Sequence, residues 1–568
     1  MSIKKLSLLA AVSYVSAFVS VPIAGQQQHP LSWTPARTGP GSGSNFKCDL
    51  PPVLDPTKDG LPSAKELFSS KKALHEQIKR HQAVVRVPSI CYDDLGSFDK
   101  DKRWEPFYEL HDVLAETYPV VHKRAKLEKV NTFGLVYTIE GSNKDLKPLL
   151  LAAHQDVVPV ADEKTWTHPP FSGHWDGEWL WGRGSMDDKD ALTAIMSTME
   201  TLLSNPKWKP SRTIILAFGF DEECSGYRGA GKIAEHLEAK YGKDGIAMIL
   251  DEGGLGMVKI DHVLYALPGV YEKGHVDIWF ELHVVGGHSS VPFPHTGIGI
   301  ISEIVAALEA HPYQPKLIED GPIHHHLLCQ ARYTPDAEPQ LTDLLGKGDL
   351  DGVARFMADA SLMTKYMLQT SQAVDFIRGG QKINAMPEIT TLGVNYRVAP
   401  QDSIPLVQHN VVEHIQDIVS RYGLNVKAFE GDSEYENYLA DNHPELLVRS
   451  AADDIDYQGT LVLQAKEATK PSPISPSTGP IWDVFAGTIR NTLAFKDGTV
   501  VPASETMTGN TDTRHYANLT PHIYRWTPID KDSASGIHTI DERVRMDNHM
   551  EIVRFYYDLV RNFDASDA

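Results

Sequence analysis

Between residues 132 and 254 the sequence alternates short apolar runs with longer helical patterns. The runs "PLLLAAHQDVV", "RTIILAFGF" and "GIAMILDEGG" are apolar almost to their ends, as in strands buried on both faces. The segments 190–204 and 229–242 have the apolar spacing of helices. Strands and helices in this order form a sheet covered by helices on both faces. The sequence therefore predicts an α/β fold with a mixed, largely parallel sheet.

The pattern changes after about residue 274. The run "HVDIWFELHVVG" alternates apolar and polar residues, as a half-exposed strand does. A chain of 568 residues is also too long for one compact core. We therefore expect one α/β domain in two parts, residues 63–274 and 472–568, interrupted by an α+β insertion at residues 275–471.

The first 25 residues have two lysines, an apolar stretch and then small residues, which is the pattern of a secretory signal peptide. The apolar stretch is also long enough for an uncleaved anchor, and this alternative stays open. Residues 26–62 are rich in Gln, Pro, Gly and Ser and predict a flexible linker. With the signal cleaved, we expect a protein without a stable membrane span, located in a vacuole or outside the cell.

The net charge of −21 argues against nucleic acid or an anionic membrane as the main partner, because both select basic surfaces. The chain has four cysteines, namely Cys48, Cys91, Cys224 and Cys329. Cys48 and Cys91 could pair, although sequence alone does not fix the connectivity. Cys224 is expected to be a small buried filler rather than a nucleophile.

Acidic and histidine side chains gather where the predicted strands end. They are His154 and Asp156, Asp187 and Asp188, Glu222 and Glu223, and Asp251. Ligands bind at the carboxyl ends of parallel strands, and adjacent buried carboxylates are costly unless cations neutralise them. Imidazole and carboxylate without thiolate suit zinc, with manganese or cobalt as substitutes. Two such ions can acidify a shared water enough to yield hydroxide near neutral pH.

Six motifs, in this order, resemble those of the co-catalytic dizinc metallopeptidases: "HQD", "GRGSMDDK", "DEE", "DEGG", "GGHSSVP" and "GIHTIDERV". That family includes carboxypeptidase S, the aminoacylases and bacterial glutamate carboxypeptidase. The resemblance runs from about residue 65 to the end and is greatest to the carboxypeptidase S group. It implies a zinc-peptidase-like fold in which the insertion is a lid or dimerisation domain.

The resemblance also implies a set of metal ligands. His154 and Asp251 would hold one zinc, and Glu223 and His538 would hold the other. Asp187 would bridge the two ions. His515 is the competing choice for the place given to His538, and the closing motif "GIHTIDERV" favours His538.

Further roles follow from the same resemblance. Glu222 would be the general base and acid, and Asp156 would bond the second nitrogen of His154 and fix its tautomer. A cis peptide bond is implied between Asp187 and Asp188.

The remaining implied residues lie in or near the insertion. His288 would swing over the metals and stabilise the oxyanion. Asn384 and Arg397 would contact the substrate, the arginine through its carboxylate. Gly509 belongs to a substrate loop at residues 507–516. The run His324–His326 is expected to have a surface or packing role, because adjacent helical residues point in different directions.

The predicted function is a dizinc metallo-carboxypeptidase that acts on short Gly-Xaa peptides. A free carboxylate next to the scissile amide fits an N-acyl amino acid equally well, so an aminoacylase-like amidohydrolase is the alternative. A non-catalytic protein that keeps the fold is a remote third reading. The sequence leaves open whether the chain forms a homodimer.

Overall fold

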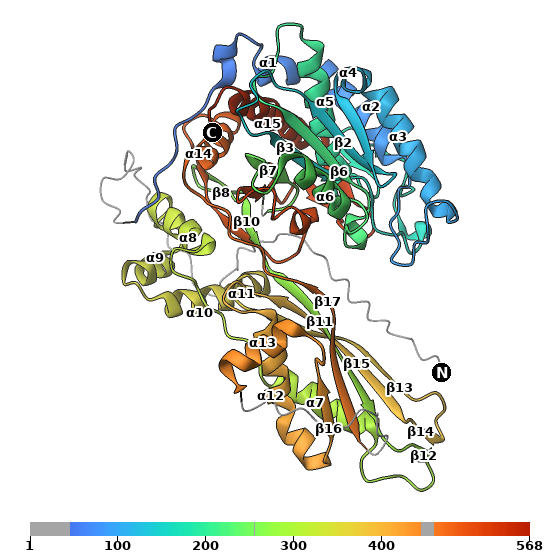
Figure 1. Ribbon diagram of the computed structural model, residues 1–568. Helices are drawn as coiled ribbons and strands as arrows, with labels where there is room; N and C mark the ends of the chain where they lie inside the picture. Colours follow the sequence, from blue (N-terminus) through green and yellow to red (C-terminus); the bar gives the residue numbers. More distant parts are fainter. Residues whose placement is uncertain (1–45, 255, 445–458) are drawn as a thin grey trace, which may run out of the picture.

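The computed structural model describes residues 46–254, 256–444 and 459–568, and Figure 1 shows two parts joined by extended strands. The expected signal peptide, residues 1–25, and the first part of the expected linker, residues 26–45, lie outside the described residues. Among the described helices, none has the length and apolar character needed to cross a membrane.

The larger part is built on an eight-stranded sheet in the order β1-β2-β6-β3-β7-β20-β10-β19. In that order the strands are Lys126–Val130, Gly134–Ile139, Ile214–Gly219, Leu149–His154, Met248–Asp251, Ile523–Arg525, Gly269–Glu272 and Glu505–Met507. The pairs β3·β6, β3·β7, β7·β20 and β10·β19 are parallel, and the rest are antiparallel. The predicted α/β fold with a mixed, largely parallel sheet is confirmed.

The two faces of this sheet are covered by different helices. Leu149 and Leu151 of β3 belong to the core beneath α5 (Lys189–Ser204), α14 (Pro480–Thr492) and α15 (Met546–Asp564). Leu150, between them, belongs to the core beneath α6 (Ala230–Tyr241). Because successive strand residues point to opposite faces, a strand that is buried throughout needs such a layer on each side. The first layer also includes α2 (Lys71–Val85), α3 (Glu105–Thr117) and α4 (Pro119–Arg124).

The smaller part is an insertion whose sheet has the order β13-β15-β11-β17-β16. These strands are Ser371–Gly379, Ile389–Val398, Gly274–His283, Thr460–Thr469 and Asn425–Ala428. Alternate residues of β11, from Val276 to Leu282, pack against α7 (Gly297–Glu309) and α12 (Ile404–Tyr422), with α13 (Ser433–Asn442) beside them. The chain leaves the large sheet after β10 and returns to it in β19 and β20, so the insertion interrupts one domain.

Four further helices of the insertion have a core of their own. They are α8 (Pro322–Tyr333), α9 (Pro339–Gly346), α10 (Leu350–Ala360) and α11 (Leu362–Leu368). The shorter remaining elements are α1 (Ala64–Phe68), β4 (His174–Trp175), β5 (Trp179–Trp181), β8 (Met257–Ile260), β9 (Val263–Ala266), β12 (Gly287–His288), β14 (Ala385–Met386), β18 (Thr499–Pro502), β21 (Ala534–Ser535) and β22 (Arg543–Arg545).

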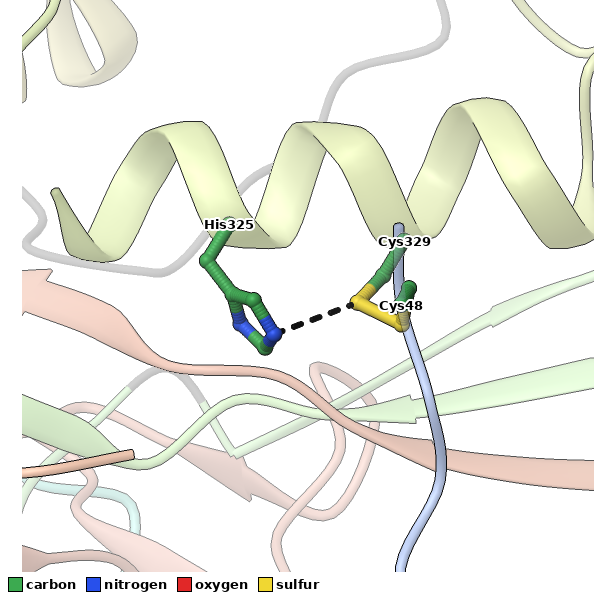
Figure 2. A group of neighbouring side chains, drawn as sticks. All are labelled: Cys48, His325 and Cys329. Atoms are coloured by element: carbon green, nitrogen blue, oxygen red, sulfur yellow. Dashed lines mark hydrogen bonds between the residues drawn. A yellow bond between two sulfur atoms is a disulfide. The ribbon is translucent and has the colours of Figure 1, made fainter. Parts of the chain in front are cut away.

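Residues 46–62 form a packed strap rather than the expected flexible linker. Cys48 is buried and bonded to Cys329 of α8, as Figure 2 shows, with His325 beside the bond. The N–H of Leu54 donates to the carbonyl of Gly487 at 3.1 Å. The composition of the segment suggested a linker, but tertiary contacts hold its second half in place.

The disulfides also correct the sequence expectations. Cys48 pairs with Cys329 and Cys91 pairs with Cys224, so Cys48 and Cys91 are not partners. Cys224 is therefore a cross-link and not an unbonded filler. Both bonds join positions more than a hundred residues apart in sequence, with separations of 281 and 133, which a local pattern does not reveal.

Candidate metal centre

The candidate site lies at the carboxyl ends of three adjacent strands, β6, β3 and β7. His154 is the last residue of β3, and Glu222 and Glu223 follow β6 in a short 3-10 helix, η4 (Glu222–Cys224). Asp187 precedes α5, and His538 lies in the loop between β21 and β22. Parallel strands end at the same edge of a sheet, so the topology brings distant parts of the sequence together here.

Asp187 stands between the two histidines. One of its oxygens, Oδ1, lies 3.0 Å from His154 Nε2, and the other, Oδ2, lies 3.0 Å from His538 Nε2. Glu223 Oε2 is 3.1 Å from the same nitrogen of His538. A carboxylate that presents one oxygen to each of two imidazoles has the arrangement of a bridging ligand. The peptide bond between Asp187 and Asp188 is cis, as the resemblance implied.

Glu252, and not Asp251, faces His154. Glu252 Oε1 lies 3.3 Å from His154 Nε2, and it forms a close group with His154 and Glu222. Asp251 Oδ1 instead accepts the N–H of Glu252 at 3.0 Å, and burial raises the pKa of Asp251 to about 6. Asp251 ends β7, and the next residue points the other way. The carboxylate next to His154 at the end of β7 is therefore that of Glu252, the second acid of "DEGG", and not that of Asp251.

Asp156 supports the site in two ways. Its backbone carbonyl accepts Nδ1–H of His154 at 3.0 Å, while its carboxylate is farther from that nitrogen, at 3.4 Å. This bond leaves Nε2 of His154 facing Asp187 and Glu252. The Asp156 carboxylate also accepts the N–H groups of Glu222 and Glu223, at 3.1 and 3.0 Å. Asp156 thus orients the histidine mainly through its backbone, and it orients the two glutamates through its side chain.

The pKa shifts of the side chains in this site indicate an excess of negative charge. Burial raises the pKa of Glu223 and of Glu252, each to about 7, and the charge of Asp187 adds to both shifts. Hydrogen bonds to Asp187 and Glu223 raise the pKa of His538 to about 11. Burial alone would lower the pKa of His154, but Glu252 and the bonds to Asp156 and Asp187 outweigh it and raise the pKa. These carboxyl groups keep two imidazoles protonated, so the cluster carries negative charge that divalent cations would neutralise.

Glu542 and Arg183 join the two loops of the site and were not singled out from the sequence. Glu542 Oε1 accepts the N–H groups of Met186 and Asp187, at 3.0 and 3.2 Å. Its Oε2 accepts from Arg183 Nη1 at 2.6 Å, and Arg183 also donates to the carbonyl of Thr539. The acid within the motif "GIHTIDERV" was the available signal; the structure shows it buried, and a buried carboxylate needs partners.

His288 and Asn384 lie far from this centre, at the tip of the insertion, where Figure 1 shows β12 and β14. His288 Nδ1 is 2.7 Å from Ser290 Oγ, and the carbonyl of Asn384 accepts the N–H of Ser289 at 3.1 Å. The ten residues of β11 alone span about 33 Å. The described chain therefore does not bring His288 over its own candidate metal centre, contrary to the expectation.

Arg397 and Gly509 lie at the base of the insertion. Arg397 pairs with His275 at the start of β11, and its Nη1 lies 3.3 Å from Asn510 Oδ1. Asn510 Nδ2 donates to the carbonyl of Lys273, and the side of Gly509 where a side chain would begin faces open space. The predicted carboxylate-binding arginine and the predicted substrate loop are therefore neighbours.

The competing histidines do not face the cluster. His515 Nε2 lies 3.0 Å from the carbonyl of Ser225, behind η4. His326 Nδ1 is bonded to Glu505 at 2.6 Å, and His325 lies beside the Cys48–Cys329 disulfide (Figure 2). The run His324–His326 thus has packing roles, as expected.

A cavity of about 650 Å³ extends from Asp187 and Glu252 to His326 of α8. Its walls include the apolar side chains of Met257, Leu267 and Ile529. The volume is within the range of small-molecule sites.

A model of Peptidase family M20/M25/M40 matches residues 150–562, and the chain belongs to this family. It is 37% identical over 545 residues to carboxypeptidase S of Saccharomyces cerevisiae, covering 92% of this chain and 90% of that one. It is 29% identical over 503 residues to an N-fatty-acyl-amino acid synthase/hydrolase of Mus musculus, covering 87% and 88%.

Among solved structures, the di-peptidase Dug1p of Saccharomyces cerevisiae superposes with a TM-score of 0.58 at 12% identity, covering 89% of this chain and 99% of that one. Identity this low shows a shared fold only. The family match confirms the resemblance drawn from the six motifs and the expectation of a peptide-bond hydrolase.

Proposed function

We propose that the protein is a dizinc metallo-carboxypeptidase that removes the C-terminal residue of short Gly-Xaa peptides. The observation that carries the proposal is Asp187, whose two oxygens face His154 and His538. In this proposal His154, Asp187 and Glu252 hold one ion, and Asp187, Glu223 and His538 hold the other. The donor set contains only imidazole and carboxylate, which fits zinc and allows manganese or cobalt. Such a pair acidifies a water and polarises a carbonyl.

Glu222 is the proposed general base. Within the described residues its carboxylate makes no hydrogen bond, whereas Glu223 contacts His538. The backbone N–H groups of Glu222 and Glu223 both donate to the Asp156 carboxylate, which fixes the turn and lets the neighbouring side chains take different roles. Glu222 would accept the proton of the attacking water and pass it to the departing amine.

Arg397 is proposed to bind the substrate carboxylate, because a guanidinium can donate two parallel hydrogen bonds to it. Its neighbour Asn510 already holds the Gly509 loop close to it. A carboxylate fixed there would select substrates with a free C-terminus next to the scissile amide.

His288 and Asn384 are proposed to act on the site of a second copy of the chain. The tip carries strongly exposed apolar side chains, with Ile383 99% and Val291 76% exposed. Edge strand β13 adds Phe376 and Ile377 to this surface. Monomeric proteins rarely leave such surfaces open, so a homodimer that covers them and delivers His288 is the proposed assembly.

The location proposed is the secretory pathway, with a vacuole or the exterior as destination. All four cysteines are in disulfides, which persist in oxidising compartments.

An N-acyl amino acid amidohydrolase is the second candidate. The apolar part of the cavity wall, with Met257, Leu267 and Ile529, and the likeness to the mouse enzyme support it. Purified zinc-loaded protein offered glycyl-leucine and N-oleoyl-leucine side by side separates the two. Higher kcat/KM on the peptide supports the carboxypeptidase, and higher kcat/KM on the acyl substrate supports the amidohydrolase. Bound zinc without hydrolysis of either substrate would contradict both and favour the non-catalytic reading.

A further inference from the structure

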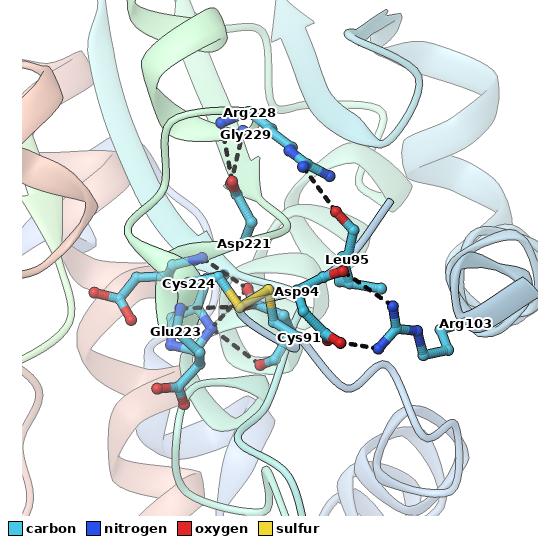
Figure 3. Close-up of a disulfide and its surroundings, with 12 residues drawn as sticks. Cys91, Asp94, Leu95, Arg103, Asp221, Glu223, Cys224, Arg228 and Gly229 are labelled. Carbon is cyan, nitrogen blue, oxygen red and sulfur yellow. Dashed lines mark hydrogen bonds and ion pairs between the residues drawn. A yellow bond between two sulfur atoms is a disulfide. The ribbon is translucent and has the colours of Figure 1, made fainter. Parts of the chain in front are cut away.

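The Cys91–Cys224 disulfide lies next to Glu223 of the candidate metal centre, and Figure 3 shows the bond with Glu223 and Asp221 beside it. Cys224 is the last residue of η4 and follows Glu223 in the chain. Cys91 belongs to a segment that runs beside the loop after β3, because its N–H donates to the carbonyl of Val157 at 3.1 Å. In the same segment Ser89 Oγ donates to the carbonyl of Gln155 at 2.7 Å. The disulfide therefore connects η4, which carries Glu222 and Glu223, to the segment with Cys91. That segment is hydrogen-bonded to the residues that follow His154.

A second link joins the same two regions. The Asp156 carboxylate accepts the N–H groups of Glu222 and Glu223. One link is covalent and the other is a pair of hydrogen bonds to an anion. Together they fix the distance between η4 and the loop that follows His154.

The turn that carries Glu222 and Glu223 has a physical reason to open. Asp221 precedes the two glutamates, so three acids are consecutive, and Asp156 adds a fourth carboxylate beneath them. Like charges at this spacing repel before cations bind. The acceptor of the two hydrogen bonds, the Asp156 carboxylate, is itself one of the repelling groups, whereas a covalent bond does not weaken with charge.

The Cys91 side of the link is itself anchored. Arg228 donates to the carbonyls of Gly96 and Leu95, at 3.0 and 2.9 Å. Arg103 forms an ion pair with Asp94 at 2.7 Å. Cys91 also packs in an aromatic cluster with Trp104, Phe107, Phe133 and Phe220. A bond to such a segment holds the turn against a rigid support.

We propose that the Cys91–Cys224 disulfide is a positioning element of the metal centre, which holds Glu222 and Glu223 where zinc binding and proton transfer need them. The inference rests on the proposed function and deepens it. A displacement of about 1 Å at a reacting group can cost about a hundredfold in rate. Metal affinity and turnover should therefore depend on this bond beyond its effect on global stability.

The test compares two double variants of the full-length protein, Cys91→Ser/Cys224→Ser and, as the control, Cys48→Ser/Cys329→Ser. The control bond closes a longer loop, with a separation of 281 against 133, so in the chain-entropy picture its loss costs at least as much stability. Three quantities are measured: the unfolding temperature, the zinc affinity by chelator competition, and kcat and KM with saturating zinc.

We expect the Cys91→Ser/Cys224→Ser variant to bind zinc at least about tenfold more weakly, by analogy with losses of groups that orient metal ligands. We expect its kcat to fall by about 10–100-fold while KM changes little. The control should lose unfolding temperature but keep zinc affinity.

Wild-type affinity and kcat in the Cys91→Ser/Cys224→Ser variant would overturn the inference, as would an equal loss of affinity in the control. A wild-type protein that binds no zinc would instead remove the proposed function itself. Should the variant not fold, folded wild-type protein is reduced with a phosphine and alkylated instead. The species modified only at Cys91 and Cys224 is identified by mass. It replaces the variant in the test after the reagents are removed. Undiminished zinc affinity in that species would equally overturn the inference.

Discussion

The end of the central sheet and the tip of the insertion both carry motifs of the same family, yet only the first assembles a site within one chain. His154 and Glu223 lie together because the adjacent parallel strands β3 and β6 end at one edge, and Asp187, just before α5, lies at the same edge. His288 lies beyond a ten-residue strand that points away from that edge. The topology of the sheet fixes the position of a strand end. The position of the tip of the insertion depends on the length of its strands and on what docks against it.

The strongest test on the sheet side is Glu222→Gln. The variant should keep bound zinc and lose about 10²–10⁴-fold in kcat, because an amide cannot take the proton from water. Steady-state kinetics with metal analysis of the same sample checks both. Near-full activity would assign the proton transfer to another group.

The tip is tested by His288→Ala. Loss of an oxyanion donor should cost about 10²–10³-fold in kcat and leave zinc content unchanged. If a second copy supplies the histidine, mixing and reassembling His288→Ala with Glu222→Gln should restore activity, since half of the dimers are mixed and each has one complete site. Recovery should reach about a quarter of the wild-type rate per chain. A mixture as inactive as its components would exclude delivery by a partner.

The correction at the end of β7 has a matched pair of variants. Glu252→Gln removes a carboxylate that faces His154 and should weaken zinc binding by at least about tenfold. Asp251→Asn changes a carboxylate that accepts the Glu252 N–H and should have the smaller effect. Chelator competition measures both, and the reverse order would return the ligand role to Asp251.

The sheet part should also have a stability that depends on pH. Burial lowers the pKa of His81 from 6.5 to about 4, and the nearby His549 contributes. Between pH 6.5 and 4 this histidine is protonated in the unfolded chain but not in the folded chain. Its contribution to the free energy of unfolding is therefore fully present above pH 6.5 and is lost as the pH drops toward 4. The loss amounts to about 3 kcal/mol. Denaturant unfolding of wild type and His81→Gln should show a shallower decline in the variant, and parallel curves would contradict the assignment.

The sequence predicted the parallel sheet because β3 and β6 are apolar on both faces. It also indicated His154, Asp187, Glu223 and His538, which the structure brings together. It missed Glu252 because the motif "DEGG" does not show where the strand ends, and one residue reverses the side of a side chain.

Other features depended on contacts that no local pattern contains. Cys48 and Cys329 are brought together by the fold, and the same contact orders a strap whose composition suggested a linker. The position of His288 depends on the length and direction of β11, and in the proposed assembly on a second chain.

The measurement that tests the account most directly is the zinc content of the dialysed protein, determined for wild type, Asp187→Ala and His288→Ala. Asp187 is proposed to hold both ions, and His288 neither. We expect two zinc ions per chain in wild type, two in His288→Ala and none in Asp187→Ala. Zinc that persists in full after Asp187 is replaced would contradict a centre built around that carboxylate.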